Sequence, residues 1–346
     1  MNRNDVSFLA IGQCGGNIGK LFESAGFNVV CINTSIEDLE TIKAKQPYHI
    51  TGAEGSAKDR NISKRLITNG EWSKINQFID DKLKTPFVYV IFSAAGGTGS
   101  GASPMLIDNL IGTYPDKNIG AIVVLPSQNE SLQAQANAVE AMREMQNIDG
   151  ICSVFAIDNS KAEDKKLINE TFVNDFISLL GLPDVKNIDG VIDNADLKRS
   201  LTAGGYGIIG RLTKEQSSTE RMLSALSGGI YVPAEKDELI EYVVLSASAS
   251  IDLQKIKEQY GEPLATFQSV NPDETVCLLS GLSAPQARLN GIANYVKSAN
   301  EKRQMLRAKK KVDALESLNV AIDVPEQKRE IKKRTAEDIW AKYLRK

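Results

Sequence analysis

The feature that most limits the possible folds is a run of small residues at positions 94–103, Ala-Ala-Gly-Gly-Thr-Gly-Ser-Gly-Ala-Ser. The apolar stretch from Phe87 to Phe92 precedes this run, and a helix-like stretch from Pro104 to Ile111 follows it. Because glycine has no Cβ, such a segment lets the backbone approach a ligand closely, and the N-terminus of the next helix offers free N–H groups and a partial positive charge. A strand, a glycine loop and a helix in this order predict a site for the phosphates of a nucleotide.

Apolar, β-branched runs recur through the first half of the chain, at residues 7–11, 28–32, 87–92, 120–125 and 151–157. Helix-like stretches separate most of them. Continuous hydrophobicity is typical of strands that are buried on both faces, so we expect a parallel sheet with helices on both sides. Ligands of such sheets bind at the carboxyl ends of the strands.

The second half of the chain has a different pattern. Leu167, Phe172, Phe176 and Leu179 form one apolar face of a long helix expected over residues 162–180. Beyond it, strand-like segments at 239–248 and 275–282 and a helical segment at 287–299 predict a smaller α+β domain. The expected fold class is α/β, divided into a nucleotide-binding domain (1–161), a central helix (162–186), an α+β domain (187–300) and a basic helical tail (301–346).

The composition is that of an ordinary globular protein, with 42% apolar and 25% charged residues among 346. No apolar run approaches the ~18 residues of a membrane span, and the N-terminal residues lack the charged-then-apolar plan of a signal peptide. We therefore expect a cytoplasmic protein with no membrane partner.

Histidine and cysteine are too scarce or too scattered for several kinds of active site. His49 is the single histidine, which argues against a histidine base and against histidine-rich metal sites. Cys14, Cys31, Cys152 and Cys277 are far apart in the sequence and are expected to be reduced thiols. No protein metal ligand is predicted, and carboxylates, hydroxyls, amides and backbone groups remain for the chemistry.

Charge is unevenly distributed along the chain. Residues 301–346 contain 14 Lys and Arg against 8 Asp and Glu, whereas the whole chain has a net charge of −3. A basic tail suits a polyanion or an acidic partner, although a solvated helix face would have the same composition.

Two familiar nucleotide motifs compete for the glycine segments. A P-loop requires Gly-x-x-x-x-Gly-Lys-Ser/Thr, and the nearest approach, at Gly19-Lys20, has Cys14 in place of the first glycine and Leu21 in place of the hydroxyl. A dinucleotide fingerprint can be aligned with residues 97–102, but this segment follows the third strand rather than the first. A Rossmann-type NAD oxidoreductase is therefore a distant alternative.

A third interpretation uses two glycine segments together. Residues 12–19, Gly-Gln-Cys-Gly-Gly-Asn-Ile-Gly, resemble the first nucleotide loop of tubulin and FtsZ, and residues 95–101 resemble their Gly-Gly-Gly-Thr-Gly-Ser/Thr-Gly signature, with Ala95 at its first position. Residues 33–35 and 52–56 resemble a loop beneath the nucleotide and a loop that senses the γ-phosphate. The resemblance implies nucleotide contacts from Gly12, Gln13, Cys14, Asn17, Asn33, Gly55, Ala95, Gly96, Gly97, Thr98, Gly99 and Ser100.

Three further residues extend the resemblance towards the nucleoside. Glu130 lies in the loop that reaches the ribose in the family, and the pair Asp158-Asn159 resembles a step whose amide contacts guanine. Asn159 could instead cap the following helix. The resemblance also places Asn169, on the inward face of the central helix, against guanine, since an amide can pair with the guanine edge. Lys165 occupies the position four residues earlier, where no aromatic is available for stacking.

Asp193 and Asp196 can be interpreted in two ways. Two acids spaced by three residues before a helical stretch are most simply a helix N-cap. However, the segment also resembles the Asn-x-Asp-x-x-Asp loop of the tubulin/FtsZ family, with Val191 in place of the leading Asn. The resemblance implies that these two residues are catalytic carboxylates that act on the nucleotide of the next subunit.

The mechanism that this resemblance implies is a cycle of assembly and hydrolysis. Subunits bind GTP, with Mg²⁺ held mainly by phosphates and water, associate head to tail, and hydrolyse GTP to GDP at their interface. The basic tail resembles that of plasmid- and phage-borne TubZ-type proteins, which move DNA through a DNA-bound adaptor. An FtsZ-like division or structural filament remains the alternative.

Overall fold

The computed structural model describes residues 1–185, 190–235 and 239–318 of the chain. Residues 1–298 pack as one compact unit, and the described residues from 299 onwards belong to a second. The strands are β1 (Val6–Ile11), β2 (Asn28–Asn33), β3 (Pro47–His49), β4 (Phe87–Ser93), β5 (Asn118–Leu125), β6 (Val154–Asp158), β7 (Tyr206–Thr213), β8 (Ile240–Ala247), β9 (Pro263–Val270) and β10 (Glu274–Leu282).

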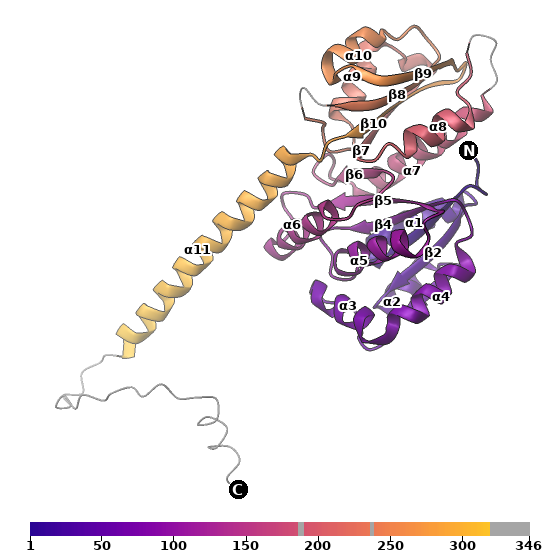
Figure 1. Cartoon of the computed structure of the whole chain (residues 1–346). Helices are drawn as coiled ribbons and strands as arrows, with labels where there is room; N and C mark the ends of the chain where they lie inside the picture. The colour runs from indigo at the N-terminus through magenta and orange to yellow at the C-terminus, as the bar shows by residue number, and fades with distance from the viewer. Residues whose placement is uncertain (186–189, 236–238, 319–346) are drawn as a thin grey trace, which may run out of the picture. The chain divides into compact units, whose positions relative to one another are not determined.

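Every helix from α1 to α10 lies between two strands that are consecutive in the chain (Figure 1). The helices are α1 (Gly12–Ser24), α2 (Ile36–Ile42), α3 (Arg60–Leu66), α4 (Trp72–Lys82), α5 (Thr98–Thr113), α6 (Leu132–Gln146), α7 (Lys165–Gly181), α8 (Asn194–Leu201), α9 (Thr219–Gly228), α10 (Leu253–Tyr260) and α11 (Gln286–Leu318). In the described parts of the chain, none is both long and apolar enough to cross a membrane.

The ten strands form one mixed sheet in the order β3-β2-β1-β4-β5-β6-β7-β10-β8-β9. The strands from β3 to β6 pair in parallel, whereas β10 pairs antiparallel with both β7 and β8. The order of the first six strands is that of doubly wound nucleotide-binding sheets, whose ligands bind beside the first strand where the chain reverses direction. The expected α/β fold, with a parallel sheet and a second α+β region, is confirmed. The four-part division of the chain stays a prediction.

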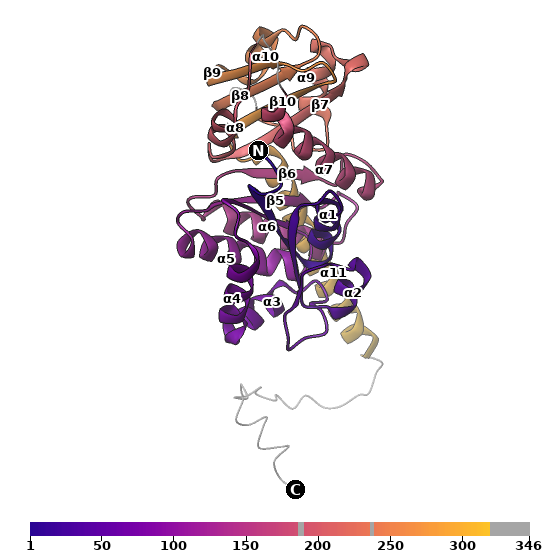
Figure 2. The ribbon, with the colours of Figure 1, turned by 90° about the vertical axis from the view of Figure 1, so that its right-hand side faces the viewer.

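Side chains of the parallel strands alternate between two buried layers. In β1, Phe8 and Ala10 belong to one apolar cluster, and Leu9 and Ile11 belong to the other. The first cluster is covered by α1 and α7, and the second by α4, α5 and α6, on the opposite side of the strands (Figure 2). Burial on both faces explains why the sequence of these strands is continuously apolar.

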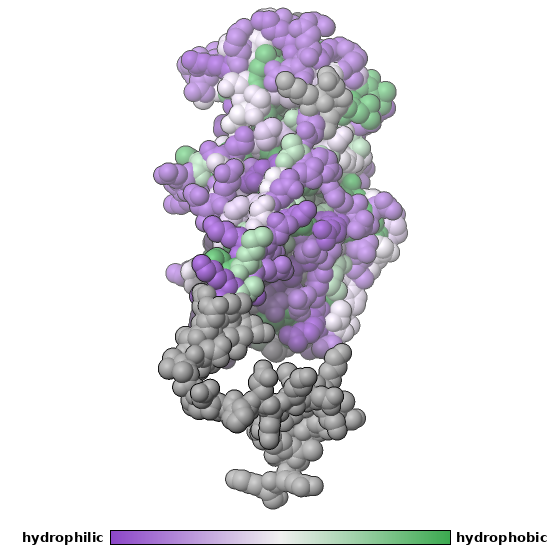
Figure 3. Space-filling model, turned by 90° about the vertical axis from the view of Figure 1, so that its left-hand side faces the viewer, coloured by the Kyte–Doolittle hydropathy of each residue, from purple (hydrophilic) through white to green (hydrophobic). Residues whose placement is uncertain are grey.

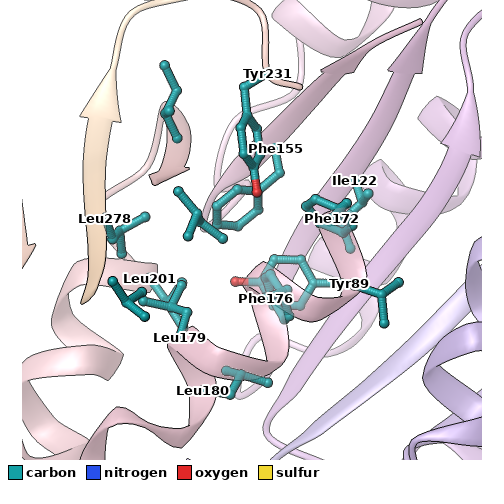
Figure 4. Close-up of a cluster of buried hydrophobic side chains, with 14 of the residues drawn as sticks. Tyr89, Ile122, Phe155, Phe172, Phe176, Leu179, Leu180, Leu201, Tyr231 and Leu278 are labelled. Carbon is teal, nitrogen blue, oxygen red and sulfur yellow. The ribbon is translucent and has the colours of Figure 1, made fainter. Parts of the chain in front are cut away.

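Helix α7 contributes the centre of the first layer. Phe172, Phe176 and Leu179 are fully buried, and Figure 4 shows them among side chains from the strands. The Phe176 ring lies 5.1 Å from Tyr89 and 5.4 Å from Phe155 in edge-to-face contacts, the arrangement that aromatic pairs prefer. Leu167 was expected on the same face but is 55% exposed, and the buried face begins instead at Ile168, which is 1% exposed.

Four other differences from the expected elements concern the start of one helix and three strands. Helix α5 begins at Thr98 rather than near Pro104, so Gly99 and Gly101 belong to the helix. Glycine lets α3 pack closely there, since a Cβ on Gly101 would be 2.2 Å from the Arg60 carbonyl oxygen. Strands β3, β7 and β9 were not predicted.

The face of the molecule in Figure 3 is mostly hydrophilic, with small scattered apolar areas.

Candidate nucleotide-binding site

A cavity of about 500 Å³ opens at the carboxyl ends of the parallel strands. It is lined by residues that follow β1, β2, β4, β5 and β6 and by the first turns of α7. The lining includes almost all the residues that the sequence placed at a nucleotide, namely Gly12, Gln13, Cys14, Asn17, Asn33, Gly55, Ala95, Gly96, Gly97, Thr98, Gly99, Glu130, Asn159 and Asn169. Ser100 is not part of the lining, because it is buried inside α5 and its hydroxyl donates to the Gly96 carbonyl.

Two helix N-termini form one end of the cavity. Helix α1 begins at Gly12 and α5 begins at Thr98, so both glycine segments lie at the start of a helix. The first N–H groups of a helix have no partner within the helix and carry a partial positive charge, which suits phosphate oxygens. This end of the cavity can therefore hold a phosphate chain.

Two glycines at this end are required by their geometry, Gly12 by its backbone conformation and Gly97 by the space around it. Gly12 has φ of +72°, a left-handed conformation that favours glycine. A Cβ on Gly97 would lie 2.3 Å from the Ser56 hydroxyl oxygen and 3.0 Å from the Asp59 amide nitrogen. The second contact is with backbone, so the loop of residues 52–59 would have to move.

Buried hydroxyls connect the three segments around the phosphate end. The Thr98 hydroxyl lies 2.7 Å from that of Thr34, which follows β2, and 3.1 Å from that of Ser56. All three residues are less than one tenth exposed. These hydrogen bonds fix the position of the glycine segment relative to residues 52–59.

Asn137 of α6 also holds the glycine segment in place beside residues 52–59, and it was not identified from the sequence. Its side-chain Nδ2 donates to the carbonyl oxygens of Lys58 (2.8 Å), Ala95 (3.2 Å) and Gly96 (3.0 Å), and the residue is 1% exposed. One signal was available, since Asn137 is a polar residue on the small-residue face of α6, beside Ala138.

Residues 57 and 58 have strained backbone. Ala57 and Lys58 have φ of 45° and 63°, in the left-handed region that residues with a Cβ rarely adopt. Both line the cavity, and the contact between Asn137 and the Lys58 carbonyl holds them there. The sequence did not single out Lys58, which brings a cation to the phosphate end.

The opposite end of the cavity carries amides and one ion pair. Asn159 is 8% exposed, and its Oδ1 has no hydrogen-bond partner among the described residues. Asn159 does not cap α7, because the side chain of Asp164 does so. Lys165 donates to Glu130 at 2.8 Å. An oxygen buried without a donor is costly, so Asn159 is matched to a ligand that brings N–H groups, as a guanine edge does.

The acidic side chains of the lining already have partners. Asp38 accepts from the Asn33 amide at 3.0 Å, and Glu130 accepts from Lys165. Desolvation raises the pKa of the Cys14 thiol to about 12, so Cys14 is neutral at pH 7. In the parts of the chain that are described, no group of three or more His, Cys, Asp or Glu residues is placed to hold a metal ion.

Asp193 and Asp196 do not line the cavity of their own chain. They form a capping box at the start of α8: Asp193 Oδ1 accepts from the N–H groups of Ala195 (2.7 Å) and Asp196 (2.9 Å), and Asp196 Oδ2 accepts from the Asp193 N–H (3.1 Å). Asp193 and Asp196 therefore do cap the helix, as the first of the two interpretations predicts. Any action of these carboxylates on a nucleotide requires a second copy of the chain.

Comparison with known proteins identifies the class to which this site belongs. The GTPase domain of the Tubulin/FtsZ family matches residues 5–165, which contain β1 to β6 and most of the cavity lining. These residues therefore match a tubulin/FtsZ-family GTPase domain, a kind of domain that binds GTP and GDP. The family comprises GTP-hydrolysing filament proteins.

Within this class the chain resembles TubZ over most of its length. It is 26% identical to the tubulin-like protein TubZ of Clostridium botulinum C phage over 313 residues, which cover 89% of this chain and 87% of that protein. It is 27% identical to the tubulin-like protein CetZ of Pyrococcus abyssi over 348 residues, covering 88% and 92%.

Solved structures agree with this assignment. The structure of tail-truncated Clostridium botulinum phage c-st TubZ superposes with a TM-score of 0.79 at 25% identity and covers 87% of this chain and 99% of that one. A GTPγS-form protofilament of Bacillus thuringiensis serovar israelensis TubZ shares the fold, with a TM-score of 0.73 at 17% identity, covering 88% and 95%.

Proposed function

We propose that the cavity binds GTP, with the phosphates at the N-termini of α1 and α5 and guanine at Asn159 and Asn169. The observation that carries this proposal is the buried Asn159 Oδ1, which has no partner among the described residues at the end of the cavity away from the glycines. The N1–H and N2–H groups of guanine would satisfy it, whereas the N1 atom of adenine is an acceptor. Mg²⁺ would be held mainly by phosphates and water.

Hydrolysis would take place between two copies of the chain that associate head to tail. Asp193 is exposed and Asp196 is half-buried, so a second copy could bring its nucleotide to them. One carboxylate would orient the attacking water or accept its proton, and the other would support the water network. Because each copy supplies half of the site, contacts of this kind repeat into an open filament. A TubZ protofilament with GTPγS supports this arrangement.

The filament would segregate plasmid or phage DNA through a DNA-bound adaptor that contacts the basic tail. Residues 301–310 are all exposed and include Lys302, Arg303, Arg307, Lys309 and Lys310. The remaining basic clusters of the tail, in residues 319–346, lie outside the described residues. Salt should weaken such a contact strongly. An FtsZ-like division or structural filament would instead leave the inheritance of plasmid or phage DNA unchanged when the protein is lost.

The first experiment is GTP turnover and pelleting measured against protein concentration. We expect turnover only above a critical concentration. Asp196→Ala should pellet with GTP but hydrolyse it poorly. Asp193→Ser should keep the helix cap, since serine is a good N-cap residue, while losing the carboxylate.

A control isolates the loss of a helix cap from the loss of catalysis. Asp252 is also an N-cap aspartate, at the start of α10, with its carboxylate accepting from the Gln254 N–H at 3.0 Å. Asp252→Ala should leave turnover per polymer unchanged. Turnover that is linear from zero protein concentration, or full turnover by Asp193→Ser, would contradict hydrolysis at a shared interface.

A further inference from the structure

A buried ion pair connects α11 to the strand end beside the nucleotide cavity. Arg288, the third residue of α11, donates from Nε to Asp158 Oδ2 (2.8 Å) and from Nη2 to Asp158 Oδ1 (3.1 Å). Asp158 is the last residue of β6 and is 2% exposed, while the Arg288 side chain is 16% exposed. Neither residue lines the nucleotide cavity.

The same guanidinium also holds a second loop. Arg288 Nη2 donates to the Pro126 carbonyl at 2.7 Å, at the start of the loop between β5 and α6. The Asn159 N–H donates to the Leu125 carbonyl at 3.1 Å, so the two loops are hydrogen-bonded to each other at the same point. Arg288 is therefore bonded at the start of both loops that carry Asn159 and Glu130 into the cavity.

The position of Arg288 on its helix indicates that these contacts decide its placement. A cation in the first turn of a helix is unfavourable with the helix dipole, which places partial positive charge there. Only arginine offers a planar fork that can serve a carboxylate with two donors and a carbonyl at once. Burial alone would raise the pKa of Asp158, but hydrogen bonds from Arg288 and from the Ser160 N–H keep this pKa below its ordinary value.

The phosphate end of the cavity is built without Arg288. There a buried arginine, Arg60 of α3, is 8% exposed and bonds the Glu144 carboxylate at 2.7 and 2.9 Å and the Ser100 carbonyl at 2.8 Å. Each end of the cavity thus has its own arginine, buried at the phosphate end and partly buried at the other, which bonds the backbone at or beside a ligand-lining segment.

We propose that Arg288 is a positioning residue for the nucleoside end of the cavity, which fixes Asn159 and the Glu130 loop so that they can bind the base and ribose. This inference rests on the proposed binding of GTP. It predicts that loss of Arg288 weakens the binding of ligands that carry a nucleoside and leaves the binding of a bare phosphate chain unchanged. A merely structural role would weaken both.

The test compares dissociation constants, measured by calorimetry at protein concentrations below assembly, for GTP, GDP and inorganic tripolyphosphate with Mg²⁺. Arg288→Ala should weaken GTP and GDP by about tenfold each, the effect of losing roughly one well-formed hydrogen bond to the ligand. Its constant for tripolyphosphate should stay within about twofold of the wild-type value. Arg288→Lys keeps a charge beside Asp158 but loses the planar fork. Its dissociation constant for GTP should lie between those of the wild type and Arg288→Ala, and its constant for tripolyphosphate should be unchanged. This variant serves as the readout if the alanine variant does not fold.

Arg60→Ala is the matched control, because it removes a buried arginine from the other end and should weaken GTP and tripolyphosphate together. The inference is overturned if both Arg288 variants bind GTP as the wild type does, or if they lose tripolyphosphate affinity by the same factor as GTP. If the wild type itself binds no GTP, the proposed function fails together with this inference, an outcome distinct from the other two.

Discussion

Asp175 is a buried acid of α7 whose raised pKa should make the protein less stable as the pH rises from about 4 to about 7. It is 7% exposed, and burial raises its pKa from an ordinary value of 3.8 to about 7; Arg211 lowers it by attraction, and Glu274 raises it by repulsion. Arg211 donates to Glu274 at 2.7 Å, so the positive charge of Arg211 is shared between Glu274 and Asp175. Tyr231 also interacts electrostatically with Asp175.

The sign and size of the effect follow from the two pKa values. Below about pH 4 both the folded and the unfolded chain hold the proton. Between pH 4 and pH 7 only the folded protein holds it, so the free energy of unfolding falls by about 1.4 kcal/mol for each unit that the pH rises. Above pH 7 the penalty is complete, at about 4 kcal/mol for a shift of roughly three units.

Asp175→Asn removes this titration while keeping the shape of the protonated acid. In urea unfolding of the nucleotide-free protein at pH 8, the variant should be more stable than the wild type by about 4 kcal/mol. At pH 5 this difference in stability should be smaller by about 3 kcal/mol. Asp80→Asn, which changes an exposed carboxylate on α4, is the control and should show no such trend. A difference between wild type and Asp175→Asn that is the same at pH 5 and pH 8 would refute the reasoning.

Three further substitutions test the cavity. Gly97→Ala should abolish tight GTP binding in a calorimetric titration, because its Cβ meets Ser56 and the Asp59 backbone; unchanged affinity would mean that the loop moves freely. Asn137→Leu should leave the carbonyls of Lys58 and the glycine segment without a donor and cost about 1–3 kcal/mol in urea unfolding, with weaker GTP binding. Asn159→Ala should reduce the preference for GTP over ATP in competition binding, and an unchanged preference would place the base elsewhere.

The sequence was sufficient for the parallel half of the fold because the physical signal there is local. Strands buried on both faces must be apolar at consecutive positions, as in β4 and β5, and each such run was visible. Strand β9 was missed because it lies at the edge of the sheet and most of its side chains are partly or fully exposed. Strand β3 has only three residues, too few for any periodicity.

Apart from Glu130, Asn159 and Asn169, which the family resemblance placed, the lining was predictable only where its residues are adjacent in the chain. The glycine segments present their own backbone to the cavity, so their sequence carries the signal directly. Asn137 and Arg288 act instead through hydrogen bonds to residues at least 41 positions away, and no pattern around either residue specifies these partners. Contacts of this kind depend on how the helices pack, which the fold alone reveals.

Asp193 and Asp196 show why one motif supported two interpretations that are compatible. The capping box uses Asp193 Oδ1 and Asp196 Oδ2, so one oxygen of each carboxylate is not used by the cap. Hydrogen bonds to the backbone orient each side chain and leave the other oxygen free for water or for a second copy of the chain. A helix cap is thus a means of holding two carboxylates rigidly at a surface. The spacing of three residues that a capping box requires is also the spacing of the two acids in the tubulin/FtsZ motif that this segment resembles.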